Sequence, residues 1–347
     1  MRLRHALPAV AVVGFVAFAL VGQPEPASAP KMTAAAKAFL AALSPDQQKT
    51  ANLPFDSKAR LAWFFTPQQD KERKPTRVGV RLETMTAAQK AAALELLKTG
   101  LSADGFRQAT TIMSLEGILA DLEGTKGTNV RSPGWYFVTV FGEPGTAGAW
   151  GWRFEGHHMS VNYTLDKGAV VSATPLMFGA NPAVVKDGDR KGLRTLPAVE
   201  DNARALIKSL TPEQDKVAKQ PTPKGVEGWE IKENSPTADV GAPKGIPADK
   251  LDAAQRKTLD ALLRAYTERM PADLAAAEAE RAAKTAPGAM FFAYTGSAEV
   301  GQAYTYRVYA PEFVVEFLNV QADSAKNPAN HIHSAWRRLP GDFAAAR

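Results

Sequence analysis

Three segments of this chain recur later in the same order, and this repetition restricts the fold more than any other feature. Each early segment meets its counterpart after roughly 150 to 170 residues, about half of the chain. We therefore predict a tandem duplication, with halves at 30–190 and 191–347 related by a pseudo-twofold axis. The matching pairs are "LSPDQQK" with "LTPEQDK" (Leu43–Lys49, Leu210–Lys216), "TAAQKAAALELLK" with "DAAQRKTLDALLR" (Thr86–Lys98, Asp252–Arg264), and two aromatic-rich stretches that begin with Pro-Gly (Pro133–Leu165, Pro287–Asn319).

Each predicted half runs from helices to strands. The first two pairs of segments carry apolar residues at helical spacing, and a Ser-Pro or Thr-Pro step before an acid marks a helix start. The third pair alternates with period two, is rich in aromatic and β-branched residues, and is interrupted by Gly and Pro. That pattern predicts a β-hairpin and a further strand. The expected class is α+β, with helices segregated from a mostly antiparallel sheet.

The histidines are the second constraint, because the chain has only five and four of them form two tight pairs. His5 lies near the start, His157 and His158 form "GHH", and His331 and His333 form "HIH". Each half supplies one pair, so we predict that the pairs meet in one site between the halves. The chain has no cysteine, and a nitrogen-rich site suits zinc, copper or iron. An open position on such a metal activates water or admits dioxygen, which favours a metal-dependent enzyme.

Strand alternation predicts which histidines of the two pairs face the same point. His331 and His333 are two residues apart and share one face of a strand, whereas the adjacent His157 and His158 face opposite ways. A bulge at Gly156 is the alternative that re-aims one of them. Between these two we favour His158 as the ligand, since its predicted face carries polar neighbours.

Further residues have candidate roles around these histidines. Glu155 is a candidate ligand or general base, and Asp342 is a second candidate carboxylate ligand. Arg153 and Arg337 are candidate catalytic residues that hold an anionic ligand. Two alternatives stay open: a metal-free acid/base or anion-binding constellation, and a purely structural hydrogen-bonded core. No zincin helix, phosphate loop or Gly-x-Ser-x-Gly elbow occurs.

A metal-free binding module is the second functional hypothesis. Its ligand is a small molecule or a cell-envelope glycan, held in a cleft lined by aromatic side chains of the paired hairpins. Core packing is the competing interpretation of the same aromatics. The long Pro/Gly/Lys-rich stretch Lys219–Pro247 is either a surface excursion or a lid that contributes Trp229. The aromatic residues in question are Trp135, Trp150, Trp152, Tyr304 and Tyr306.

The first 29 residues have the layout of a secretory signal peptide. Two arginines precede an apolar run, Ala6–Val21, and the small-residue sequence Ala27-Ser28-Ala29 follows. Pro30 directly after this sequence is unfavourable for cleavage, so an uncleaved anchor is the alternative. We predict a periplasmic or secreted protein with a small-molecule or envelope substrate. The net charge of +6 forms no dense basic stripe, which argues against nucleic-acid binding.

The chain also resembles an exported bacterial family catalogued as domain of unknown function 3500. The similarity lies in "RVGVRLETMTAAQKAAALELLKTGLSADGF", "GWRFEGHHMSVNYTL", "TPLMFGANP" and "NHIHSAWR", with "DF" soon after. It spans roughly residues 35–343 and departs from the pattern after Phe343, where the chain soon ends. The resemblance implies an exported protein of one architecture and supplies no activity.

Overall fold

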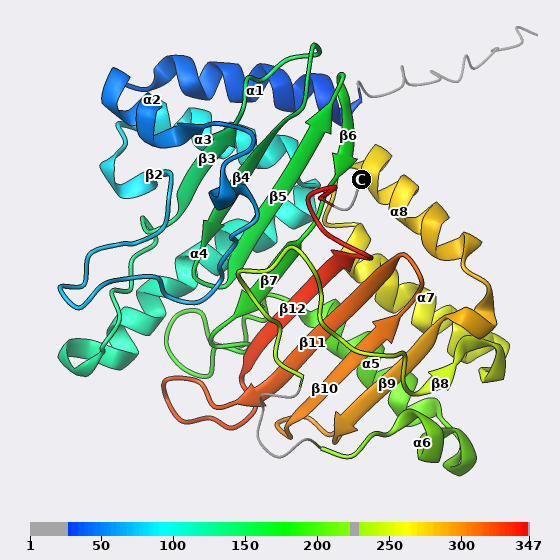
Figure 1. The fold of residues 1–347 in the computed structure, drawn as a ribbon. Helices are drawn as coiled ribbons and strands as arrows, with labels where there is room; N and C mark the ends of the chain where they lie inside the picture. Colours follow the sequence, from blue (N-terminus) through cyan, green and yellow to red (C-terminus); the bar gives the residue numbers. More distant parts are fainter. Residues whose placement is uncertain (1–26, 223–228, 346–347) are drawn as a thin grey trace, which may run out of the picture.

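One large mixed sheet forms the centre of the molecule, seen in the computed structural model of Figure 1, which describes residues 27–222 and 229–345. The sheet has 12 strands in the order β1-β3-β4-β5-β7-β12-β11-β10-β9-β8, with β2 on β3 and β6 on β5. All pairs are antiparallel except β1 with β3. The predicted α+β class is confirmed. The strands are β1 Asn52–Leu53, β2 Val80–Arg81, β3 Phe137–Phe141, β4 Trp150–Gly156, β5 Met159–Asp166, β6 Ala169–Ser172, β7 Leu176–Ala180, β8 Ile246–Pro247, β9 Phe291–Gly296, β10 Tyr304–Tyr309, β11 Phe313–Gln321 and β12 His331–Arg338.

The pairing of β7 with β12 joins the two predicted halves. Ala180 lies opposite Ile332 and Leu176 opposite Trp336 in this antiparallel pair. Because β7 comes from the first half and β12 from the second, the sheet is continuous across the predicted boundary at residues 190 and 191. The "HIH" strand therefore lies beside strands of the first half.

The helices begin where the sequence places capping residues. Ser44, Thr86, Thr211 and Asp252 each accept a hydrogen bond from the backbone three residues on, and a glutamine there returns one. This capping box satisfies backbone N–H groups that have no partner within the helix. The eight α-helices of the described residues are α1 Ser28–Ala42, α2 Pro45–Ala51, α3 Ala87–Thr99, α4 Ala103–Glu123, α5 Pro197–Ser209, α6 Pro212–Ala218, α7 Ala253–Thr267 and α8 Ala272–Lys284.

Matched contacts recur in the two halves. Gln89 joins Gln47 and donates to the carbonyl of Ala42, while Gln255 joins Gln214 and donates to the carbonyl of Ser209. These glutamines are the capping residues of the repeated segments. A duplicated chain accounts for both sets at once; the duplication and its pseudo-twofold axis remain predictions.

The two faces of the sheet are covered differently. Helices α4, α5 and α7 lie behind the sheet in Figure 1, while the long connections around 52–79 and 229–245 cross in front of it. The helical face holds the main apolar core. Four of the five aromatics proposed for a cleft lie in that core with at most 1% of their surface exposed: Trp150, Trp152, Tyr304 and Tyr306. The packing interpretation therefore accounts for them.

The long connection Lys219–Pro247 reaches the sheet face in front. Trp229 is buried there against Ala293 and Val314, with the Arg307 guanidinium 5.0 Å from its ring centroid. It lies over the second half of the sheet and does not line the histidine site. Residues after it, from Glu230 onward, do line that site. Residues 223–228 of this stretch are outside the described residues.

The predicted signal segment is outside the described residues up to position 26. The first described helix, α1, already begins at Ser28. Among the described residues, no helix has the length and apolarity that a membrane crossing requires.

Candidate metal centre

The histidines of "GHH" form a turn and do not continue a strand. β4 ends at Gly156 and β5 begins at Met159, and these two residues pair across the hairpin. His157 and His158 are therefore the two loop residues, and His158 has a φ of 61°. Tight two-residue turns commonly need such a left-handed residue. The predicted alternation of faces through this pair is wrong, and the β4–β5 register has no bulge at Gly156.

The backbone of His158 is held on both sides. Its N–H donates to the carbonyl of Phe65 at 2.8 Å, and its carbonyl accepts from the N–H of Gly179 at 2.7 Å. Glycine is required at 179, since an added Cβ there would lie 2.6 Å from the Ile332 carbonyl and 3.1 Å from the His158 ring. Because the glycine of "FGA" in β7 has no side chain, there is space beside it for the His158 ring.

Three imidazole rings from the two predicted halves converge. His331 and His333 lie on the same face of β12, as predicted, and their Nε2 atoms are 3.2 Å apart. The Nε2 of His158 is 2.7 Å from that of His331. One ring nitrogen of each residue lies within 4.8 Å of the other two. Ligands of a tetrahedral zinc ion lie about 3.3 Å apart, given zinc–nitrogen bonds near 2.0 Å. This group of three can therefore hold a metal ion.

A carboxylate lies behind one of these rings. Glu230 Oε1 is 2.8 Å from Nδ1 of His333, so Nδ1–H donates to the carboxylate and Nε2 keeps its lone pair for a metal. This is the usual second partner of a metal-bound histidine.

Two of the three rings, those of His158 and His331, are suited to bind as neutral ligands. Burial, followed by the neighbouring imidazoles, lowers the pKa of His158 well below its ordinary value. Burial and then His333 lower the pKa of His331 in the same way. The lowered pKa keeps the rings of His158 and His331 uncharged at neutral pH, the state that metal coordination requires.

His157 points to different partners. Its Nδ1 is 2.5 Å from Glu116 Oε1 on α4 and 3.1 Å from the Arg131 guanidinium. Arg131 in turn pairs with both carboxylate oxygens of Glu123. The His157 ring stacks on that of His158 with centroids 3.7 Å apart. His157 thus supports the site from outside the group of three.

Arg153 and Glu155, predicted as catalytic, face the connection that crosses the sheet. The Arg153 guanidinium donates to the carbonyls of Ala59, Arg60 and Ala62. Glu155 accepts from the N–H of Phe64 at 2.9 Å and is 3.7 Å from Arg153. Both side chains are buried and neither lines the cavity beside the histidines.

Arg337 and Asp342 lie farther along the same face. Arg337 has no exposed surface, bonds to Asp342 at 2.7 and 2.8 Å, and donates to the carbonyls of Lys232 and Ser235. Asp342 also accepts from the backbone of Arg338. The pair thus fastens the C-terminal segment and a connection to the sheet, and neither residue lines the histidine cavity.

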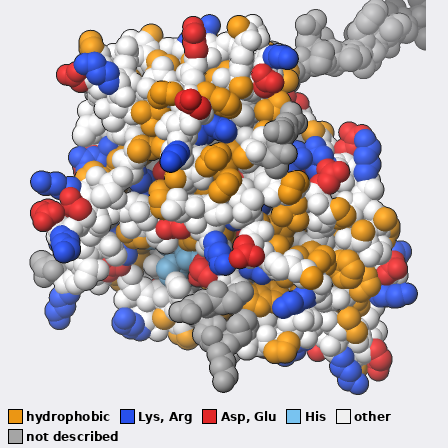
Figure 2. Space-filling view, in the orientation of Figure 1, with side chains coloured by type: hydrophobic (Ala, Val, Ile, Leu, Met, Phe, Trp, Pro, Cys, Tyr) orange, Lys and Arg blue, Asp and Glu red, His pale blue; other side chains and the backbone are white. Residues whose placement is uncertain are grey.

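A cavity of about 570 Å³ opens over the histidines. Histidine side chains are visible from outside on the face shown in Figure 2, beside acidic side chains. The walls combine many polar and charged side chains with a few apolar residues. The lining residues are Phe65, Thr66, Pro67, His157, His158, Glu230, Ile231, Lys232, Glu233, Ser235, Gln321, His331 and His333.

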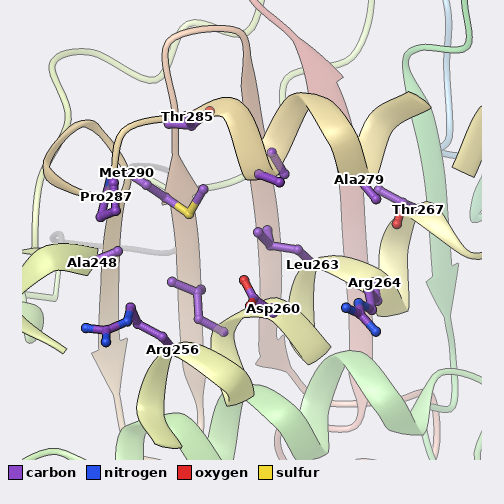
Figure 3. A pocket seen from close by; sticks show the side chains of 13 residues that line it. Ala248, Arg256, Asp260, Leu263, Arg264, Thr267, Ala279, Thr285, Pro287 and Met290 are labelled. Carbon is purple, nitrogen blue, oxygen red and sulfur yellow. The ribbon is translucent and has the colours of Figure 1, made fainter. Parts of the chain in front are cut away.

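A second cavity, of about 360 Å³, lies between α7 and α8 (Figure 3). Leu263 and Met290 contribute apolar surface, while Arg256, Asp260 and Arg264 lie toward one side. It contains no histidine and no group of metal-ligating side chains. The chemistry of the described residues therefore concentrates at the first cavity.

The comparisons with known proteins give a family and no activity. The family model for a protein of unknown function (DUF3500) matches residues 25–345. The chain belongs to this family. The resemblance seen in the sequence is thereby confirmed. No curated protein and no solved structure matches the chain.

Three acidic residues of the site were missed by sequence reasoning. Glu116 lies on α4, and Glu230 and Glu233 lie in the irregular connection after Trp229. Glu233 accepts from the N–H groups of Phe65 and Thr66 at 2.8 and 3.0 Å. It therefore fastens the segment whose carbonyl holds His158. For Glu230 and Glu233, the only available signal was the motif "WEIKE", in which two acids lie three residues apart. That spacing is common in exposed loops.

Proposed function

We propose that the protein is an exported metal-binding protein whose ligands are His158, His331 and His333. The observation that carries the proposal is the convergence of three Nε2 atoms at the base of an accessible cavity. Two predicted halves contribute, which supports a site created at their junction after a duplication. The segment of the second half that matches this turn has no histidine. Either the first half gained its histidine ligand or the second half lost one.

The ligand set favours zinc, copper or iron. Neutral imidazoles suit these borderline metals, and the chain has no thiolate that would compete. Three protein ligands leave a position free toward the cavity, which is the arrangement of catalytic sites. A metal there would lower the pKa of bound water or bind dioxygen. A metal-dependent enzyme acting on a small-molecule or cell-envelope substrate is the activity that this arrangement supports best.

Metal analysis of the protein purified from the periplasm tests the proposal. We expect close to one zinc, copper or iron ion per chain, retained through gel filtration after mild reconstitution. Removal of the ion with a chelator should lower the unfolding temperature, because a ligand that binds only the folded state stabilises it. A chain that stays essentially metal-free after reconstitution with each of the three metals contradicts the proposal.

Glu230 gives a sharper prediction about the same centre. Glu230→Ala should weaken metal affinity by roughly 10- to 100-fold, the usual effect of removing an outer partner of a histidine ligand. Glu230→Gln, which keeps an acceptor for Nδ1–H, should weaken it less. Competition with a chromophoric chelator measures both. The control is Lys232→Ala, which changes the same cavity wall but contacts no histidine; a loss equal to that of Glu230→Ala argues against orientation of His333.

A metal-free binding module remains the second candidate. The observation in its favour is the cavity itself, with apolar walls at Phe65 and Ile231. The 2.7 Å contact between His158 and His331 is also a good imidazole hydrogen bond without any metal. A ligand screen by thermal shift separates the two functions. A small molecule or glycan that stabilises the protein equally with and without chelator favours the binding module.

A further inference from the structure

The start of helix α1 bears on where the leader is removed. Ser28 and Ala29, two of the three small residues that resemble a cleavage site, are buried, with 4% and 6% of their surface exposed. Ala29 belongs to the main apolar core together with Met32. A cut after Ala29 would therefore delete core surface and the start of the helix.

Ser28 also binds the second half of the chain. Its backbone N–H donates to Asp273 Oδ2 at 2.8 Å, and its hydroxyl donates to Asp273 Oδ1 at 2.5 Å. Asp273 lies in the first turn of α8. Both oxygens of this carboxylate thus accept from Ser28, and a chain starting at Pro30 would lose these two donors and keep only those of the α8 backbone.

Pro30 itself is a favourable residue for a helix and an unfavourable one for a peptidase. It is exposed in the first turn of α1, where the missing N–H costs nothing. Directly after a cut, a proline hinders cleavage. The family match also begins before Ser28, at residue 25.

We propose that the leader is cut upstream of Ser28, between Val21 and Ser28, so that the mature protein keeps Ser28 and Ala29. This inference rests on the proposed export. The small residues available in this interval are Gly22 and Ala27. Ala27-Ser28-Ala29, despite its pattern, is then the beginning of the folded domain.

Intact mass and N-terminal sequencing of the protein from the periplasm decide the position. We expect a first residue from Gly22 to Ser28, unchanged in Pro30→Ala, which removes the block to cleavage after Ala29. A first residue at Ala29 or later overturns the inference, and so does an uncleaved chain in the periplasm. A full-length chain confined to the cytoplasm contradicts the export proposal instead.

A stability comparison tests the inference without export. Chains that begin at Ser28 and at Pro30, both made in the cytoplasm, should differ in unfolding temperature, with the Pro30 chain lower. Asp273→Ala should lower the unfolding temperature of the Ser28 chain more than that of the Pro30 chain, because only the Ser28 chain has the two Ser28 donors, while both chains keep the α8 backbone donors. Asp260→Ala, an exposed carboxylate on α7, is the matched control. Equal unfolding temperatures of the two chains overturn the inference.

Discussion

Replacing any one of His158, His331 and His333 by alanine should reduce the bound metal from about one ion per chain to almost none. Each substitution leaves two nitrogen ligands, and the neighbouring His157 ring is held by Glu116 and Arg131 instead. Since loss of an outer partner alone typically costs 10- to 100-fold in affinity, loss of a direct ligand should exceed about 100-fold. Elemental analysis of the desalted variants measures the effect, and circular dichroism checks that each remains folded.

His157→Ala is the matched control, because it removes the neighbouring ring of the same turn. It should retain its metal, with a moderate loss of stability from the unpaired Glu116 carboxylate. This outcome distinguishes a centre of three histidines from one of four. Equal loss of metal from His157→Ala and His158→Ala would place both rings in the coordination sphere and contradict the assignment.

The distribution of histidines predicted most of this centre. Four histidines in two pairs, one pair in each predicted half, indicated a shared site, and three of the four meet. Period-two spacing also predicted correctly that His331 and His333 face together. These conclusions depend on residue type and repeat position, which the sequence states directly.

The same reasoning did not predict the turn at His157 and His158. Tight hairpins usually contain Asn-Gly or another glycine pair, and alternating residues flank this turn on both sides. The segment therefore reads as one continuous strand. Tertiary contacts determine the turn: Phe65 and Gly179 hold the His158 backbone in a left-handed conformation. Such a conformation costs of order 1 kcal/mol for a residue with a side chain and is often found at functional sites.

The contacts of Arg153, Glu155 and Arg337 are structural, and the catalytic roles assigned to them from the sequence stay predictions. Charged residues beside candidate ligands resemble catalytic groups in a sequence, yet these three bind the connections that cover the sheet. The sequence did not reveal the partners because the contacts are to backbone groups far along the chain. Glu230 was missed for the related reason that it lies in an irregular segment without periodicity.

Asp342→Ala should therefore destabilise the fold strongly and act on the metal centre only indirectly. Arg337 and Asp342 are both completely buried, and the substitution leaves a guanidinium charge in the interior without its main partner. Breaking a buried pair by removing one member costs about 3–5 kcal/mol of unfolding free energy. Urea unfolding followed by tryptophan fluorescence gives this quantity, with the wild-type chain measured at the same metal loading.

Two variants make that result interpretable. Asp239→Ala removes a carboxylate from the exposed pair with Lys232 and should leave the stability unchanged, because solvent screens such pairs. The double variant Arg337→Met, Asp342→Leu removes both buried charges and should recover much of the loss, since well-packed apolar residues can replace a buried ion pair. Normal stability in Asp342→Ala, combined with loss of activity once a substrate is known, would instead support the catalytic role predicted for Arg337.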